Sequence, residues 1–202
     1  MTPDPSLQQR HFDALYAASD DPWNVRERWY EQRKRALLLA CLGKPRYRSA
    51  FEPGCGNGEL TAALAPRCGQ LLACDGAAGA VAAARRRLGD GPGSTRIEQR
   101  SLPSEWPAGE RFDLIVMSEL GYYFDGAALD AILAMAHANL VDDGELVLCH
   151  WLHDFDDRLL PTAALHARAA ALPGLVRTVQ HQERDFLLEA WRMTPAAPGA
   201  QA

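Results

Sequence analysis

The stretch Phe51–Leu60 reads FEPGCGNGEL and decides how the rest of the chain is interpreted. Its three glycines stand at alternate positions: Gly54, Gly56 and Gly58. Because each glycine adds to the conformational entropy that the chain loses on folding, three within five residues require a structural reason. Residues 49–52 before them read as a short strand, and apolar residues recur at helical spacing in 60–64. The stretch therefore predicts a strand, a glycine loop and a helix.

Strands and helices alternate on both sides of this loop. Before it, Val25–Cys41 predicts an amphipathic helix with one apolar stripe: Val25, Trp29, Ala36, Leu37, Ala40 and Cys41. After it, strand patterns occur at 71–75, 95–101, 112–119 and 145–151. Helical patterns separate them at 81–88 and 129–140, and turns are expected at GDGPG (89–93) and VDDG (141–144). The alternation predicts an α/β fold with a Rossmann-like, doubly wound sheet.

The pattern changes near the C-terminus. A helix within 161–172 is followed by two strand-like runs, 176–182 and 185–193, with only a few polar residues between them. That spacing predicts an antiparallel hairpin. We expect a single domain over 1–202, with a helical N-terminal arm (1–45), a Rossmann-like core (46–194) and a disordered tail (195–202).

Composition narrows the kinds of partner. The 202 residues carry a net charge of −5, which gives no basic surplus for nucleic-acid binding. The five cysteines are an odd number without CxxC spacing, which disfavours disulfides and a zinc cluster. The start of the chain lacks a basic leader, and no apolar run has the length of a membrane span. We expect a cytoplasmic protein that binds no nucleic acid, membrane or metal.

The acidic residues around the glycines indicate the charge of the ligand. Glu52 precedes the loop, where a carboxylate would repel a phosphate and attract a cation. Asp75 ends the next strand, where it can accept both hydroxyls of a ribose. Glu59 replaces the third glycine of a dinucleotide fingerprint. These features favour S-adenosylmethionine, whose sulfonium and ammonium are positive; a simple tight turn with Asp75 as a helix cap is the structural alternative.

Four runs resemble the successive motifs of class I S-adenosylmethionine-dependent methyltransferases: FEPGCGNGELTAALA, LLACDGA, FDLIVMSELGYYF and LVDDGELVLCHW. The earlier run DDPWNVRERWYEQRKRALLLACL (20–42) resembles the N-terminal segment of the nodulation protein S (NodS) family. The late runs HWLH and DFLLEAW are similar to the same group. The resemblance extends over nearly the whole chain.

The resemblance implies a seven-stranded sheet whose last hairpin is reversed. It implies that one set of residues lines the cofactor: Glu52, Gly54, Cys55, Gly56 and Asp75. It further places Ser101 and Leu102 beside the adenine and Ser118 to Tyr122 beneath the methionyl part. Ser101 departs from the family pattern, which carries an acid there to bind the adenine amine.

The N-terminal arm supplies further candidate cofactor contacts. Trp23, Tyr30 and Arg33 form a hypothetical lid, in which Arg33 pairs with the cofactor carboxylate. The alternative is that Trp23 and Trp29 are only core anchors. We interpret Cys55 as a small loop residue rather than a nucleophile, because a neighbouring acid raises the pKa of a thiol.

Three residues are candidates for the chemical step. His150 and His153 follow the fifth strand, where one of them could accept a proton from the methyl acceptor or hydrogen-bond it. Glu119, next to Tyr122 and Tyr123, could orient an amine. The alternative interpretation is that the histidines only close a loop and that the segment 119–123 only faces the cofactor.

The resemblance to the nodulation protein S family implies N-methylation of the free amine of an amino sugar at the end of an oligosaccharide. O-methylation of a sugar or another natural product is the nearest alternative, since the same pocket could hold a hydroxyl. Two further alternatives stay open at this stage: an NAD(P)-dependent oxidoreductase and a module that binds S-adenosylmethionine without catalysis.

Overall fold

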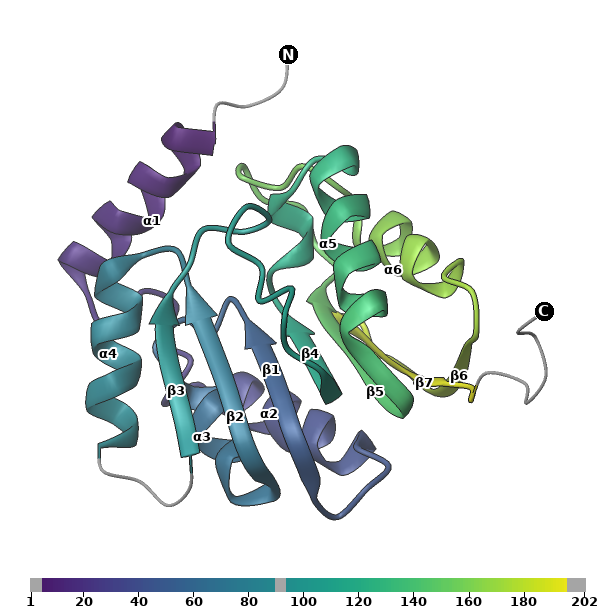
Figure 1. Cartoon of the computed structure of the whole chain (residues 1–202). Coiled ribbons are helices and arrows are strands. Elements are labelled where there is room, and N and C mark those ends of the chain that lie inside the picture. The colour runs from purple at the N-terminus through teal and green to yellow at the C-terminus, as the bar shows by residue number, and fades with distance from the viewer. Residues whose placement is uncertain (1–4, 90–93, 196–202) are drawn as a thin grey trace. The chain divides into compact units, whose positions relative to one another are not determined.

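The computed structural model describes residues 5–89 and 94–195. Figure 1 shows the chain, which divides into two compact units, Met1–Trp106 and Pro107–Ala202. Each unit combines strands with helices, as the alternation in the sequence predicts.

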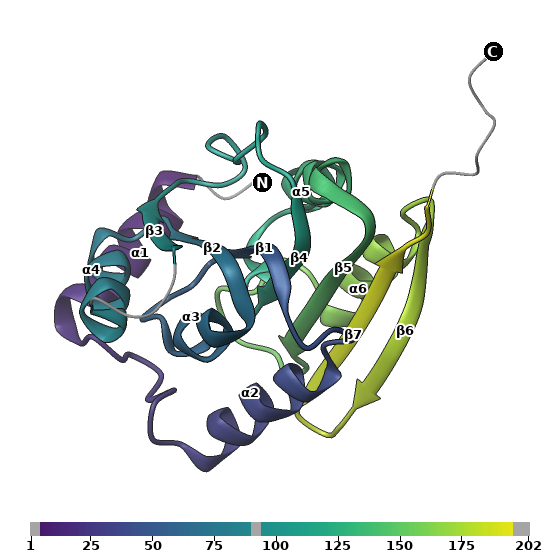
Figure 2. The same cartoon turned by 60° about the horizontal axis from the view of Figure 1, so that its bottom comes forward.

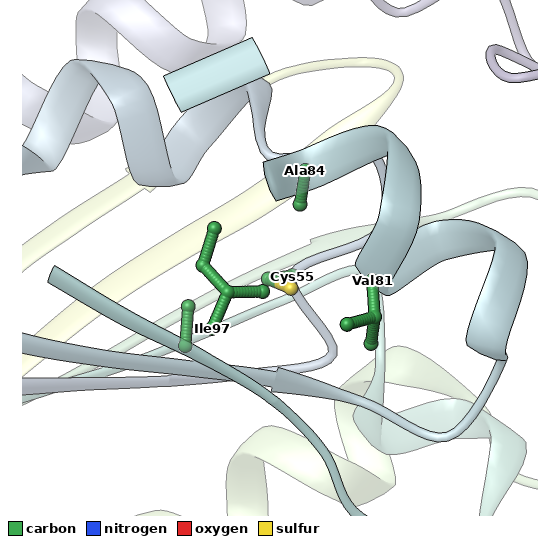
Figure 3. Packing of buried hydrophobic residues seen from close by; sticks show 5 residues of the cluster. Cys55, Val81, Ala84 and Ile97 are labelled. Carbon is green, nitrogen blue, oxygen red and sulfur yellow. The ribbon is translucent and has the colours of Figure 1, made fainter. Parts of the chain in front are cut away.

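Three parallel strands form the sheet of the first unit: β1 (Tyr47–Pro53), β2 (Cys68–Asp75) and β3 (Ser94–Gln99). The connections are α3 (Glu59–Leu64), the short helix η1 (Ala65–Arg67) and α4 (Ala78–Leu88), which runs alongside β3 in Figure 1. Small and β-branched side chains let α4 pack closely on the strands. Figure 3 shows the resulting cluster, which consists of Cys55, Ala73, Val81, Ala84 and Ile97.

The arm contains two helices, α1 (Pro5–Ala18) and α2 (Trp29–Cys41). The prediction for α2 was correct at its end but wrong at its start and in its buried face. Trp29 is 73% exposed, whereas Lys34 and Leu38 are buried. The helix starts at Trp29, so Val25 lies outside it, and the one-turn spacing from 34 to 38 defines the buried face.

The second unit contains β4 (Phe112–Ser118), β5 (Leu140–Trp151), β6 (Leu175–Gln182) and β7 (Phe186–Met193). Strands β4 and β5 are parallel, and β7 is antiparallel to both β5 and β6. The predicted hairpin is thus confirmed, and Figure 2 shows β6 and β7 as neighbouring arrows. The helices are η2 (Gly121–Tyr123), α5 (Gly126–Asn139), which Asp125 caps by accepting from the Ala128 N–H, and α6 (Thr162–Ala170).

The predicted turn at 141–144 is wrong, because β5 begins at Leu140 and includes these residues. A register shift between Phe112 and Leu114 accommodates them, and Asp143 has a positive φ of 59°. An irregularity of this kind keeps a strand paired through residues that otherwise favour a turn.

Among residues 5–89 and 94–195 the strand order is β3-β2-β1-β4-β5-β7-β6, a seven-stranded mixed sheet. This confirms the predicted fold class. The limits of a single domain stay a prediction, and most of the expected tail, 196–202, lies outside the described residues, as does most of the expected turn at 89–93. Among residues 5–89 and 94–195, no helix combines the length and apolar character needed to cross a membrane.

Candidate functional site

The glycine loop is tied to the carboxyl end of β2 by its own backbone. The N–H groups of Gly54 and Cys55 both donate to the Cys74 carbonyl, at 2.8 and 2.9 Å. The Gly56 N–H donates to Asp75 Oδ2 at 3.0 Å. These bonds hold the loop in one conformation without help from its side chains.

Positive φ angles explain the alternate glycines. They are 72° at Gly54, 55° at Gly56 and 82° at Gly58, a region that side-chain-bearing residues avoid. A Cβ at Gly58 would also lie 2.9 Å from the Cα and Cβ of Ala84, so this glycine lets the loop approach α4. The loop therefore needs glycine for its backbone and, at Gly58, for close packing.

Cys55 points away from the loop into the apolar cluster of Figure 3. Burial and the nearby carboxylates of Glu52 and Asp75 raise the pKa of the Cys55 thiol well above its ordinary value. A thiol in this state is a poor nucleophile, which supports its interpretation as a small packing residue.

Asp75 uses both carboxylate oxygens to order the backbone. Oδ2 accepts from Gly56 and Oδ1 from the Ala77 N–H at 2.9 Å. Burial raises the pKa of Asp75, and the bonds from Ala77 and Gly56 oppose that effect. Each carboxylate oxygen has two lone pairs, so Asp75 retains the capacity to accept hydroxyl groups as well.

Glu52 is a buried acid with an unsatisfied oxygen. Its residue is 3% exposed, and within the described part of the chain no group hydrogen-bonds Oε2. Burial raises the pKa of Glu52 to about 8, an effect opposed by the Thr61 hydroxyl and reinforced by Asp75. The Thr61 hydroxyl also makes no hydrogen bond of normal geometry to any described residue.

Helix α1 lies over the loops that follow β1 and β2. A Cβ at Gly56 would lie 2.8 Å from the Tyr16 hydroxyl, and a Cβ at Gly76 would lie 2.6 Å from Gln9 Oε1. Trp23 is 40% exposed and packs its ring 5.8 Å from that of Tyr16. The apolar pattern of the sequence predicts a helix only from residue 25 of the arm, so neither Tyr16 nor Gln9 was a candidate.

Glu59 joins three parts of the first unit. Its Oε1 accepts from Arg26 Nε at 2.9 Å and from Arg87 Nε at 2.8 Å, and Arg35 Nη2 lies 3.9 Å from Oε2. Burial raises the pKa of Glu59, but the hydrogen bonds from Arg87 and Arg26 outweigh it and lower the pKa. The residue that replaces a fingerprint glycine thus fastens the arm and α4 to the helix after the loop.

The other predicted cofactor residues of the first unit stand on α2 and after β3. Tyr30 is on α2, where Lys34 Nζ stands 5.1 Å from its ring centre, and Arg33 is on the same helix. Ser101 follows β3 and donates its N–H to Glu105 Oε2, and Leu102 is half-buried. Their expected contacts with the cofactor stay predictions.

In the second unit, Glu119 stands directly after β4, where Ser118 ends the strand. Glu119 has a positive φ of 54°, and its Oε2 accepts the Trp151 N–H at 3.0 Å and the Tyr122 hydroxyl. Burial and the Glu119 carboxylate raise the pKa of Tyr122 well above its ordinary value, so the phenol keeps its proton and donates. The carboxylate group is fixed in orientation.

His150 and His153 differ sharply in their surroundings. His150 is 0% exposed, and its two ring nitrogens pair with the Gly121 N–H and with His166 Nε2, each at 3.1 Å. His153 has a side chain that is 43% exposed, and its Nε2 lies 2.7 Å from Asp185 Oδ1. This geometry suits His153 better than His150 for exchanging protons with a substrate.

Two buried residues beyond His150 were also missed. His166 Nδ1 lies 2.8 Å from Glu189 Oε2, and Glu189 Oε1 accepts from Arg177 Nη1 at 2.7 Å. In sequence these residues look like ordinary members of a helix and a strand. Among residues 5–89 and 94–195, no group of three or more His, Cys, Asp or Glu side chains is arranged to hold a metal ion.

Comparisons with known proteins place this geometry in context. Residues 8–151 match the family model described as nodulation protein S (NodS). A solved structure of a candidate methyltransferase from Pseudomonas syringae is 50% identical, covers 82% of this chain and 99% of its own, and has a TM-score of 0.72. A search of curated proteins gave no match.

Two more distant structures share the fold. The N-methyltransferase NodS from Bradyrhizobium japonicum WM9, in complex with S-adenosyl-L-homocysteine, is 23% identical with a TM-score of 0.81, and the match covers 93% of this chain and 98% of that one. The DhpI complex with the same product (SAH) is 19% identical with a TM-score of 0.75, covering 95% and 98%.

Proposed function

The chain belongs to the nodulation protein S family and is an S-adenosylmethionine-dependent methyltransferase, and we propose that its methyl acceptor is the amine of a small molecule, best represented by an amino sugar or oligosaccharide. Family membership removes the oxidoreductase alternative and favours an enzyme over a module that only binds the cofactor. All five cysteines lie in the described residues and none is in a disulfide, which suits the cytoplasm that we propose as its location.

The glycine loop fits S-adenosylmethionine, which supplies an electrophilic methyl group on a sulfonium sulfur. Oε2 of Glu52 is buried and has no hydrogen-bond partner within the described part of the chain, so it is suited to an ammonium group, which would also favour the ionised form of this acid. The remaining lone pairs of Asp75 suit the two ribose hydroxyls. A phosphate would meet two carboxylates here, so the charge of the loop supports a cationic ligand.

We assign the other cofactor contacts by the same proposal. Gly54, Cys55 and Gly56 provide the backbone that the cofactor lies on, and Ser101 and Leu102 lie beside the adenine. Ser118 and Tyr122 lie beneath the methionyl part. Trp23, Tyr30 and Arg33 of the arm close over it, with Arg33 bonding the carboxylate, and Tyr16 joins this lid because its hydroxyl lies against Gly56.

The orientation of Glu119 is the observation that carries the choice of an amine. Bonds from the Trp151 N–H and the Tyr122 hydroxyl hold Oε2, and therefore also direct Oε1. A fixed carboxylate attracts an ammonium group and can orient the neutral amine through its N–H groups. A neutral hydroxyl acceptor gains less from the same charge.

An ammonium group must lose a proton before its nitrogen can attack the methyl carbon. His153 is the exposed histidine of the site, and Asp185 accepts its Nε2–H, which leaves Nδ1 to receive a proton. Its ring lies 4.8 Å from that of Trp151, whose backbone holds Glu119. We therefore assign proton acceptance to His153 and a structural part of the site to His150.

O-methylation of a sugar or natural product is the second candidate. The observation that favours it is the pair formed by His153 and Asp185, because a histidine oriented by a carboxylate can also deprotonate a hydroxyl.

Methyl transfer to matched acceptors tests the proposal. Purified protein is assayed with glucosamine and a chitin oligosaccharide bearing one free amine, against the fully N-acetylated forms, by mass spectrometry. We expect methylation only where the amine is free, and about tenfold lower kcat/KM for Glu119→Gln, which keeps the shape but removes the charge.

The control for this assay is Arg168→Ala, which removes a partly exposed cation that pairs with Asp130 and has no assigned role in the site, and it should leave the rate unchanged. Equal methylation of the acetylated acceptors would contradict the choice of an amine and support a hydroxyl acceptor.

A further inference from the structure

A chain of hydrogen bonds runs through the interior of the second unit. It begins at the Gly121 N–H in η2, passes through His150 on β5 and His166 on α6, and reaches Glu189 on β7. Arg177, whose side chain is half-exposed on β6, closes it by donating to Glu189. None of the roles assigned above uses His166 or Glu189.

The groups at the two ends of this hydrogen-bond chain, the Gly121 N–H and the Glu189 carboxylate, fix the position of the proton on each histidine ring. A backbone N–H can only donate, so His150 Nε2 must accept from Gly121 and carries no proton. The proton of neutral His150 is then on Nδ1 and is donated to His166 Nε2 at 3.1 Å. His166 in turn carries its proton on Nδ1 and donates it to the Glu189 carboxylate at 2.8 Å.

The opposite direction would not be compatible with these contacts. If His166 Nε2 carried a proton, His150 would have to accept on both ring nitrogens and would be an anion. The carboxylate of Glu189 at the far end, which only accepts, therefore selects the same tautomer of His150 that the Gly121 N–H requires. Each donor in this hydrogen-bond chain therefore faces an acceptor.

This matching of donors and acceptors matters because the groups are buried. His150 is fully buried, and His166 and Glu189 are each 3% exposed, so water cannot replace a lost partner. The absence of a side chain at Gly121 is part of the same arrangement, since a Cβ there would lie 3.3 Å from His150 Nε2 and would clash with Leu165 Cδ1.

We propose that His166 and Glu189 are positioning residues, which hold His150 in the Nδ1–H tautomer and thereby fix the segment that carries Glu119 and Tyr122. The segment has a second attachment to His150, because the Tyr122 ring packs edge-on against it with centres 5.3 Å apart. The inference rests on the proposed function, in which Glu119 and Tyr122 contact the acceptor and the cofactor.

Nitrogen-15 NMR of the histidine side chains in the ligand-free protein at pH 7 tests the tautomers directly. We expect His150 and His166 each to carry the proton on Nδ1 alone. The variant Glu189→Gln should populate a second tautomer of His166 and His150, because an amide can donate as well as accept. A wild-type His150 protonated on Nε2 would overturn the proposal without any variant.

Affinity for S-adenosyl-L-homocysteine, measured by calorimetry, tests whether the positioning matters. Glu189→Gln should bind this probe about tenfold more weakly, which corresponds to the loss of one hydrogen bond to a charged group. The matched control is His181→Ala, which removes a histidine–glutamate contact of the same 2.8 Å length, to Glu183 at the hairpin end. The control should bind like the wild type.

The outcomes separate the two proposals. Unchanged tautomers in Glu189→Gln, or unchanged affinity, would overturn the positioning role. Failure of the wild-type protein to bind the probe would contradict the proposed function. The tautomers are measured without ligand, so they would still show whether the hydrogen-bond chain is arranged as proposed.

Discussion

Glu52 in the first unit and Glu189 in the second are both 3% exposed, yet they are in opposite states. Oε2 of Glu52 has no hydrogen-bond partner among the described residues, and burial raises its pKa to about 8. Burial also raises the pKa of Glu189, but His166 and Arg177 bond both of its oxygens and bring the pKa below its ordinary value. Both oxygens of Glu189 are hydrogen-bonded within the protein, whereas Glu52 is suited to bind a group of a ligand.

The largest effect on stability should follow from removing the carboxylate of Glu189. We expect Glu189→Ala to lower the free energy of unfolding by about 3 kcal/mol, because it leaves buried His166 without its acceptor. Urea denaturation monitored by circular dichroism measures this. Glu52→Ala is the comparison: a loss of similar size there would mean that Glu52 is also satisfied within the fold.

The glycine loop should be rigid, although Oε2 of the preceding Glu52 has no hydrogen-bond partner among the described residues. Gly58→Ala should cost about 2–3 kcal/mol, from the positive φ and from crowding against Ala84. The control is Gly174→Ala in the second unit, where φ is 72° but the nearest atoms are 3.4 Å away. There we expect only the backbone strain, about 1 kcal/mol. Equal losses in thermal or urea unfolding would show that packing at Gly58 is not tight.

The pKa of Glu52 predicts a characteristic pH dependence. Its ordinary value is 4.5 and the folded value is about 8, so the folded protein keeps a proton that the unfolded chain releases. Stability from this group is therefore present at low pH and is lost as pH rises from about 5 to 8, by up to about 1.4 kcal/mol per pH unit. Glu52→Gln should remove this slope, as measured by urea denaturation at several pH values.

Ligand binding offers a second measurement of the same group. Pairing with an ammonium favours the ionised acid, so binding of S-adenosyl-L-homocysteine at pH 7 should release close to one proton in the wild type and fewer in Glu52→Gln. Calorimetry in two buffers of different ionisation enthalpy measures the number released. Equal release by both proteins would mean that Glu52 does not meet the ammonium.

The smallest effect is expected at an exposed pair on the same helix as His166. Arg168 Nη1 lies 2.6 Å from Asp130, but both side chains are more than a third exposed. Arg168→Ala should change the free energy of unfolding by no more than about 0.5 kcal/mol. A loss approaching that of Glu189→Ala would show that burial is not what distinguishes the two ion pairs.

The sequence predicted the features that depend on local pattern. Apolar runs and glycines were enough to find the strands, the glycine loop and the acids at its ends. The errors arose where tertiary structure overrides local preference: the segment 141–144 has turn residues but pairs as part of β5, and Trp29 is apolar but begins a helix and stays exposed. Helix α1 was missed, and with it Tyr16.

The candidate site was only partly predictable for a different reason. Glu52, Asp75 and Glu119 stand next to strand ends and can be read from position alone. His166 and Glu189 are 23 residues apart on different elements, and no pattern indicates that they meet. The contrast between His150 and His153 likewise depends on burial, which two neighbouring polar residues in a sequence do not reveal.

The cluster at Glu59 has one more consequence. A single carboxylate there faces the three guanidinium groups of Arg26, Arg35 and Arg87, and two of them are more than 40% exposed, so dissolved ions can reach and screen these contacts. The bend between β1 and α3 is held by backbone bonds that such ions barely affect. Raising ionic strength should therefore loosen the arm well before it disturbs the glycines beneath.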